Sequence, residues 1–223
     1  NQTVAEMIAN AFPNTLRLAI LSLGISCVLG VALGTLAAVR QKTWIDSASM
    51  AFALFGVAMP NFWFGLVLIT IFSLYLGWLP ATGVGGWNAI ILPALALGVR
   101  SAAVIARLTR SSLLEVLSQS YLATARAKGL PERVVVLRHG LRNALIPVVT
   151  IVGLQFGDLL AGAVVIEVVF ARPGIGNLAV KAIENKDFPV VQGIVLVVAT
   201  VYVLTNLLTD VTYAILDPRI TYG

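Results

Sequence analysis

The sequence predicts an all-α protein, a polytopic membrane bundle of about five transmembrane helices that form a single domain over residues 1–223. Hydrophobic residues make up 59% of the chain and charged residues 11%, and the mean hydropathy is +0.95, which is far above that of soluble domains. No Asp, Glu, Lys or Arg occurs in the 53 residues from Ser47 to Val99. Residues 100–142 then contain eight basic and two acidic side chains, a pattern typical of a cytoplasmic segment between spans.

Five apolar stretches are long enough to cross about 30 Å of hydrocarbon, which takes about 20 helical residues. They cover residues 16–39, 47–76, 89–110, 143–166 and 190–216. Pro60 predicts a kink within the second span, because membrane helices tolerate proline. Gly30 with Gly34, and Gly153 with Gly157, have the small-xxx-small spacing that lets two helices approach closely.

The positions of Lys and Arg predict the orientation of the chain. Arg40, Lys42, the 100–142 block and Arg219 belong on the cytoplasmic side by the positive-inside rule. Five crossings then put the N-terminus of this chain outside and the C-terminus in the cytoplasm. Because the net charge of +5 comes from this block between spans, membrane topology explains it better than nucleic-acid binding, and we expect no nucleic-acid partner.

Several kinds of chemistry are excluded by what the sequence lacks. The chain has one cysteine, Cys27, and one histidine, His139, so it has no intrachain disulfide and no Cys/His cluster with metal-ligand spacing. It also has no GxxxxGK[ST] motif, so no nucleotide-hydrolysing site is recognisable. We therefore expect no catalytic residue, no metal ligand and no cofactor in this chain.

The segment 167–189 is predicted to be an extracytoplasmic loop that contains a short helix. Pro173-Gly174-Ile175-Gly176 is turn chemistry, and Asn177 could cap a helix that continues to Glu184. Glu167 lies near the end of a span, where solvation at the interface is the simplest expectation. We expect this folded hairpin to lie over the outer mouth of the bundle.

The segment 118–133 carries specific start and stop residues. Ser120 can cap a helix over 121–128, and Gly129 can take the left-handed conformation that ends it. One interpretation is an amphipathic connector on the membrane surface. The other is a rigid helix of small residues that docks in a groove of a partner protein, which the missing nucleotide site favours.

The same segment carries a resemblance to a known family. Ala123-Thr124-Ala125-Arg126-Ala127-Lys128-Gly129, followed by Arg138-His139-Gly140-Leu141-Arg142-Asn143-Ala144-Leu145-Ile146-Pro147, resembles the EAA loop of ABC importer permeases in the dipeptide/oligopeptide/nickel branch. Similar motifs recur along the chain, including Asn14-Thr15-Leu16, Gly77-Trp78-Leu79-Pro80, Asp187-Phe188-Pro189 and Leu216-Asp217-Pro218-Arg219. Ala123 stands where the general pattern has Glu. Permeases of this branch usually have six spans, so the resemblance implies that the first family span is absent here.

The resemblance implies a type I ABC importer transmembrane domain in the inner membrane of a bacterium or archaeon. The chain would form half of a pathway for di- or oligopeptides, glutathione or a nickel complex, together with a second homologous permease subunit. Two cytoplasmic ATPase subunits would bind ATP and Mg²⁺, and an extracytoplasmic solute-binding protein would deliver the solute. The residues implied in ATPase coupling are Tyr121, Ala123, Thr124, Ala125, Arg126, Ala127, Lys128, Gly129 and Leu130.

Two ionisable residues, Arg100 and Asp158, fall inside predicted spans, where a charge costs at least a few kcal/mol unless it is paired or hydrated. One hypothesis is that they line the translocation pathway, where Asp158 would favour a substrate with a positive group. The alternative is a buried Arg100–Asp158 ion pair or a hydrogen bond to a neighbouring helix.

Two other functional classes remain as alternatives. An ATP-independent secondary transporter or channel fits the hydropathy, although no internal repeat around a midplane ion site is evident. An intramembrane serine protease would need Ser22, Ser26 or Ser73 next to a base, and His139 lies on the basic segment at a different depth.

Overall fold

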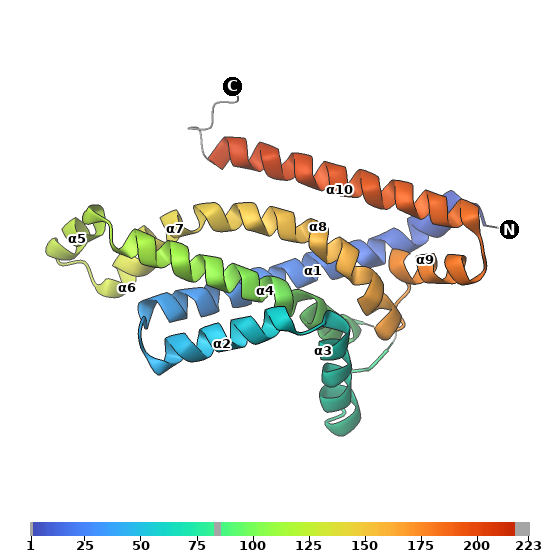
Figure 1. Cartoon of the computed structure of the whole chain (residues 1–223), viewed down its shortest axis with the longest axis horizontal. Helices are drawn as coiled ribbons and strands as arrows, with labels where there is room; N and C mark the ends of the chain where they lie inside the picture. Colours follow the sequence, from blue (N-terminus) through green and yellow to red (C-terminus); the bar gives the residue numbers. More distant parts are fainter. Residues whose placement is uncertain (1, 83–85, 217–223) are drawn as a thin grey trace.

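The computed structural model describes residues 2–82 and 86–216, and the regular secondary structure of these residues is entirely helical. Long helices run side by side along one axis (Figure 1). Four of the described helices are long and apolar enough to cross a membrane: α1 (Val4–Val39), α4 (Asn88–Leu117), α8 (Ile146–Val169) and α10 (Phe188–Leu216). A bent pair formed by α2 (Trp44–Ala58) and α3 (Asn61–Leu68), which continues into the π-helical segment η1 (Ile69–Tyr75), gives the fifth crossing if it counts as one span. The predicted all-α bundle is confirmed.

Helix α1 is longer than the predicted span because it begins at Val4 rather than near residue 16. Thr3 and Glu6 form a reciprocal capping box: Thr3 N–H donates to Glu6 Oε2 at 2.8 Å, and Glu6 N–H donates to Thr3 Oγ1 at 3.3 Å. A Thr followed three residues later by Glu is the sequence pattern of this motif. The helix therefore extends well beyond the charge-free stretch that starts at Leu18.

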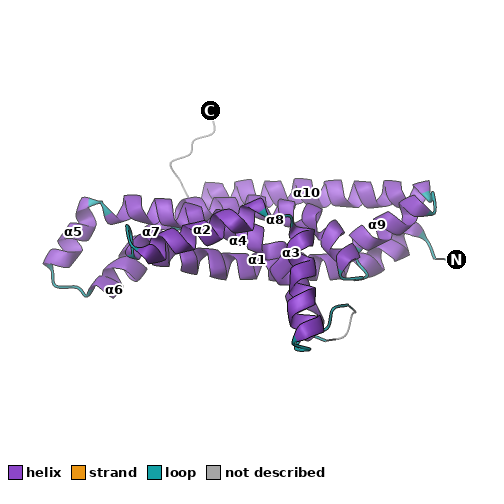
Figure 2. Ribbon diagram, turned by 60° about the horizontal axis from the view of Figure 1, so that its bottom comes forward, coloured by secondary structure: helices purple, strands orange, loops and turns teal. Residues whose placement is uncertain are grey.

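The prediction of one kinked helix over 47–76 is wrong. Met59 and Pro60 both have extended backbone, with ψ of 133° and 134°. The direction of the chain bends by 108° between α2 and the helix that follows. Proline disfavours helical geometry in the residue before it and cannot donate its own hydrogen bond, so the helix stops instead of bending. As a result α3 projects sideways from the bundle (Figure 2).

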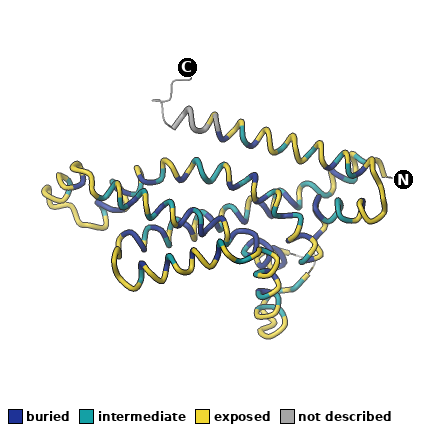
Figure 3. Tube along the Cα trace, viewed as in Figure 1, coloured by how far each residue is buried: buried dark blue, intermediate teal, exposed yellow. Residues whose placement is uncertain are grey.

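Helix α4 is the centre of the bundle. In its most apolar 18-residue window 72% of the residues are buried, against 28% for α1 and α8 and 17% for α10. Figure 3 shows this concentration of buried residues in the middle of the molecule. The other long helices therefore leave much of their apolar surface open to lipid or to another subunit.

Glycines bring the helix backbones together, as their spacing predicts. A Cβ on Gly30 would lie 2.6 Å from Ile105 Cβ, and one on Gly34 would lie 2.5 Å from the Ala106 carbonyl oxygen, so α1 and α4 are in close contact. Gly153 and Gly157 of α8 face Thr209 and Tyr202 of α10 in the same way.

The two ends of the bundle have different contents. At one end lie the turn containing Arg40 and Lys42 and the helix α5 (Ser120–Ala127), followed by α6 (Glu132–Val134), the π-helical η2 (Val135–Gly140) and α7 (Leu141–Ala144). At the other lie the start of α1 and the helix α9 (Ile175–Glu184) (Figure 1). We call these the α5 end and the α9 end. Arg219 lies outside the described residues.

Glu167 organises the α9 end, and the expectation that it is solvated at the interface is wrong. Glu167 is only 1% exposed. Oε1 accepts a hydrogen bond from Thr15 Oγ1 at 2.5 Å, and Oε2 accepts from the backbone N–H groups of Gly176 and Asn177 at 2.8 and 3.3 Å. The Glu167 carboxylate, at the end of α8, thus accepts hydrogen bonds from free backbone N–H groups in the first turn of α9. The sequence pattern predicts this capping role for the side chain of Asn177 instead.

The close approach of α1 and α4 generates a prediction. Gly34→Val should lower the apparent melting temperature of the detergent-solubilised protein by several degrees, because the new side chain meets the α4 backbone and overpacking costs about 1–3 kcal/mol. Gly24→Ala on the same helix is the matched control, since a Cβ there meets nothing within 4 Å. Equal melting temperatures for the two variants would contradict the packing argument.

Candidate functional site: the α5 segment and its supports

The short helix α5 lies in the segment that the sequence singles out, with slightly different limits. It covers Ser120–Ala127, and its N-cap residue is Gln119, with φ −72° and ψ 145°, rather than Ser120. No side chain makes a capping hydrogen bond at this end. The prediction of Ser120 as the cap is therefore wrong by one position, and Ser120 is the first helical residue.

The C-terminal end of α5 has the geometry that its glycine predicts. Gly129 has a φ of +78°, a conformation that side chains with a Cβ rarely adopt. Its N–H donates to the Arg126 carbonyl at 2.9 Å, and the Leu130 N–H donates to the Ala125 carbonyl at 3.4 Å. This pair of bonds is a Schellman motif, so the helix ends abruptly and its direction is well defined.

Side chains on the inner face of α5 attach it to the rest of the protein. Leu122 is fully buried. The Tyr121 hydroxyl accepts from Asn143 Nδ2 at 2.7 Å and donates to the His139 carbonyl at 3.3 Å. These contacts join α5 to η2 and α7, the elements that lead into α8.

An ion pair closes the turn after α5. Arg126 Nη2 and Nε donate to the carboxylate of Glu132, at 2.8 Å to Oε1 and 3.0 Å to Oε2. The guanidinium lowers the pKa of Glu132 below its ordinary value, so the pair is fully ionised at neutral pH. Its contribution is lost only as the pH falls through that lowered pKa.

The outer face of α5 presents small side chains. Ala123, Thr124 and Ala127 are exposed and share one side of the helix, since residues three and four apart are neighbours. Ala125 is half-buried, and Lys128, Gly129 and Leu130 are exposed after the helix. A rigid helix with a face of small side chains permits close backbone approach by a partner.

The α5 end is also tied to α1 and α4. Buried Ala38, Leu113, Val136 and Ala144 form one apolar cluster, and Ser112 Oγ donates to the Ala144 carbonyl at 2.9 Å. The apolar residues after Pro131, namely Val134, Val135, Leu137 and Leu141, have the spacing of one helix face, but Leu137 is 47% exposed. Residues Val135–Gly140 are π-helical, which shifts the face that each side chain occupies.

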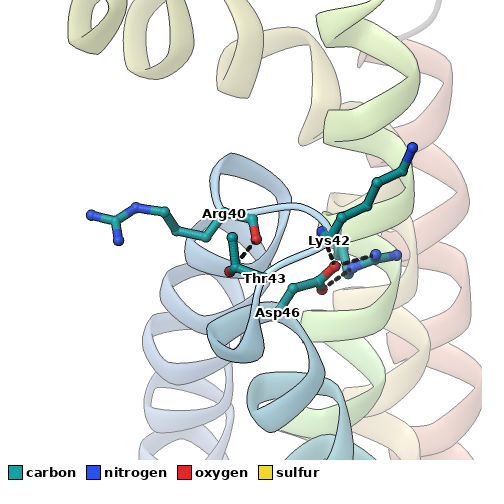
Figure 4. A network of polar contacts seen from close by, with 5 residues as sticks. Arg40, Lys42, Thr43 and Asp46 are labelled. Carbon is teal, nitrogen blue, oxygen red and sulfur yellow. Dashed lines mark hydrogen bonds and ion pairs between the residues drawn. The ribbon is translucent and has the colours of Figure 1, made fainter.

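An ion pair that sequence reasoning did not find lies nearby. Arg110 Nε and Nη2 donate to the two carboxylate oxygens of Asp46 at 2.6 and 2.8 Å, and the Asp46 side chain is 9% exposed. Asp46 also accepts from the backbone N–H of Lys42 at 3.1 Å, in the turn that joins α1 to α2 (Figure 4). The pair fastens the start of α2 to α4. The only indication in the sequence was that Asp46 is the last charged residue before the charge-free stretch.

Arg100 and Asp158 are not brought together. Both are exposed in this chain, and neither makes a hydrogen bond or ion pair with another described residue. The alternative of a buried Arg100–Asp158 pair is therefore wrong. The described residues also contain no group of three or more His, Cys, Asp and Glu side chains that could hold a metal ion.

The Asp46–Arg110 pair generates a prediction for a double-mutant cycle. Asp46→Asn and Arg110→Gln should each lower the melting temperature, because each leaves a partly buried partner without its counter-charge. The double variant should recover part of the loss, with a coupling of about 1–3 kcal/mol. Strictly additive losses, measured by thermal unfolding in detergent, would show that the pair does not fasten α2 to α4.

Comparison with known proteins agrees with this geometry. Solved structures with the same fold include the inward-facing MetNI methionine ABC transporter (TM-score 0.77, 19% identity, covering 95% of this chain and 96% of that chain) and an amino acid ABC transporter with histidines (TM-score 0.69, 15% identity, covering 96% and 94%). At these identities the likeness shows the fold alone, that of a type I ABC importer transmembrane domain.

Sequence relatives are closer. The glutathione transport system permease proteins GsiC of Escherichia coli (strain K12) and of Shigella dysenteriae serotype 1 (strain Sd197) are each 49% identical over 219 residues, which is 98% of this chain and 72% of theirs. Residues 30–222 match the family model described as the binding-protein-dependent transport system inner membrane component. The chain therefore belongs to this family and is a permease subunit of an ABC importer.

Proposed function

We propose that this chain forms half of the translocation pathway of an ATP-driven importer for small peptide-like solutes, with glutathione as the first candidate. The two GsiC relatives, 49% identical over 219 residues, carry glutathione in their names, which ranks it ahead of longer peptides and nickel complexes. Family membership favours this proposal over an ATP-independent transporter or an intramembrane protease.

The observation that carries the coupling part of the proposal is the rigid, small-faced helix α5 at one end of the bundle. Its ends are defined by Gln119 and by the Schellman motif at Gly129, and Leu122 is buried beneath it. We propose that the exposed face with Ala123, Thr124 and Ala127 lies in a groove of a cytoplasmic ATPase subunit. Two such subunits would bind ATP and Mg²⁺.

The supports of α5 suggest how movement would spread. A displacement of α5 acts on η2 and α7 through Tyr121 and Leu122, and from there on α8. The apolar cluster with Ala38 and Leu113 transmits the same movement to α1 and α4. Closure of the ATPases around ATP would thus tilt several helices together, because packed helices move as units.

The orientation follows from the same proposal. The α5 end, which carries Arg126, Lys128, Arg133, Arg138 and Arg142, would face the cytoplasm, and the α9 end would face outward. An external solute-binding protein would dock on the α9 end. The membrane would be the inner membrane of a bacterium or archaeon, and the words "inner membrane component" in the family description support this.

A second permease subunit would complete the pathway. The long helices other than α4 are mostly unburied in this chain, and Arg100 and Asp158 are exposed. An exposed charge within a span needs water or a partner. We propose that the faces with Arg100 and Asp158 line a hydrated pathway between the two permease subunits.

The coupling proposal is tested at Gly129. Gly129→Val should reduce ATP-driven uptake by at least about tenfold, because a branched residue is strained at a φ of +78° and the end of α5 would change shape. Uptake is measured in vesicles that contain the assembled transporter. Affinity purification of this chain then measures how much ATPase subunit stays bound to it. Gly129→Asn is the control, since Asn tolerates this backbone, and it should retain most of the uptake. Full coupling in the Val variant would refute the role of α5.

The pathway proposal is tested at Asp158. Asp158→Asn should raise the KM for glutathione uptake severalfold and leave the basal ATPase rate unchanged, because a favourable charge for the substrate amino group is lost. Asp158→Glu keeps the charge and should stay near wild type. If Asn and Glu variants transport identically to wild type, Asp158 does not contact the solute.

A further inference from the structure

A cavity of about 600 Å³ lies at the α9 end, between α1, the start of α4 and the turn that follows α8. Its polar lining comes from Asn14, Arg17 and Arg172, and its apolar lining includes Ile20, Trp87 and Ile90. Among the described residues that line this cavity there is no Asp or Glu. The cavity therefore combines two guanidinium groups with an apolar wall.

The two arginines differ in their surroundings. Arg172 is 6% exposed, and its Nη1 donates to the Ala89 carbonyl at 3.1 Å. Arg17 is exposed and makes no hydrogen bond or ion pair with any other described residue. Arg17 is thus the exposed guanidinium of the cavity, and Arg172 the buried one.

The depth of Arg17 follows from the sequence of α1. The stretch from Leu18 to Val39 has 22 residues without a charge, and at 1.5 Å per residue it is about 33 Å long, close to the thickness of the hydrocarbon core. Arg17 immediately precedes this stretch and so lies at the level of the lipid headgroups. Trp87, which is 79% exposed, lines the same cavity, and aromatic residues are common at the depth of the headgroups.

An apolar strip runs along α1 from Arg17 towards the membrane centre. Ile20, Gly24 and Val28 follow at helical spacings of three, seven and eleven residues, with Ile20 53% and Val28 70% exposed. A Cβ on Gly24 would meet nothing within 4 Å, so the strip has a notch at this position. A water-filled pathway would present polar side chains here, whereas a hydrocarbon chain fits this strip.

We propose that the cavity binds a glycerophospholipid, with its phosphodiester group on Arg17 and one acyl chain along the strip formed by Ile20, Gly24 and Val28. Arg17 supplies a charge that has no ion-pair partner among the described residues, and Asn14, whose Nδ2 donates to the Pro173 carbonyl at 2.7 Å, lines the same cavity. The charged part of the site lies at the depth of the headgroups and the apolar strip extends towards the membrane centre, as the headgroup and acyl chain of a lipid do. A soluble carboxylate such as glutathione has no apolar chain to occupy the strip. The bound lipid would fill the space between α1 and α4 at the α9 end.

The test uses the assembled transporter, stripped of lipid in detergent, with phosphatidylglycerol added back and counted by native mass spectrometry. Arg17→Gln should weaken the tightest-bound lipid about fivefold or more, and Arg17→Lys should largely retain it. Gly24→Leu fills the notch without changing the charge and should weaken the same lipid. Arg40→Gln removes one charge from the other end of α1 and is the control.

Three outcomes would overturn the proposal. Unchanged lipid binding in both Arg17→Gln and Gly24→Leu would show that the cavity is not a lipid site. Displacement of the tightest lipid by added glutathione would assign the cavity to the transported solute. Loss of the second permease subunit from the complex in Gly24→Leu, seen in the same spectra, would show that the strip is a protein interface.

Discussion

The close contact of α1 with α4 is the constraint on which the rest of the structure depends. In a bilayer the hydrophobic effect does not hold helices together, so van der Waals contact between small residues has to do so. Gly30 and Gly34 let the α1 backbone reach the α4 backbone, and α4 in turn is contacted by α2, α3 and α8. Because α4 leads directly to α5, the best-packed helix of the bundle also carries the segment proposed to couple it to ATP hydrolysis.

The two ends of the bundle are held by different polar contacts. At the α9 end one buried carboxylate, Glu167, joins three elements by accepting hydrogen bonds from Thr15 and from the first turn of α9. At the α5 end an apolar cluster and the Asp46–Arg110 pair hold the helices, and α5 itself stands clear with its small side chains exposed. An apolar cluster packs beside the polar contacts at each end, with Ile8, Ile175 and Val190 at the α9 end, so packing and hydrogen bonds together fix the helices.

Local sequence patterns predicted the features that depend on neighbouring residues. The apolar stretches located the long helices, Gly129 located the end of α5, and the glycine pairs located the close contacts, because each depends on residues within one or two helical turns. The break at Pro60 was underestimated, since Met59 and Pro60 each had to leave helical geometry for the chain to turn by 108°. Glu167 was misjudged because its partner Thr15 lies 152 residues away.

The amino-acid sequence by itself determined that this chain is a helical membrane protein with a short, sharply limited helix between two spans, since hydropathy and capping are local properties. Its EAA-like motifs were also enough to indicate the family. Only the tertiary structure decided that Glu167 is buried beneath α9, that Asp46 meets Arg110, that Arg100 and Asp158 remain apart, and that Arg17 opens onto a cavity. The physical reason is that the surroundings of a charge depend on residues that folding brings from distant parts of the chain.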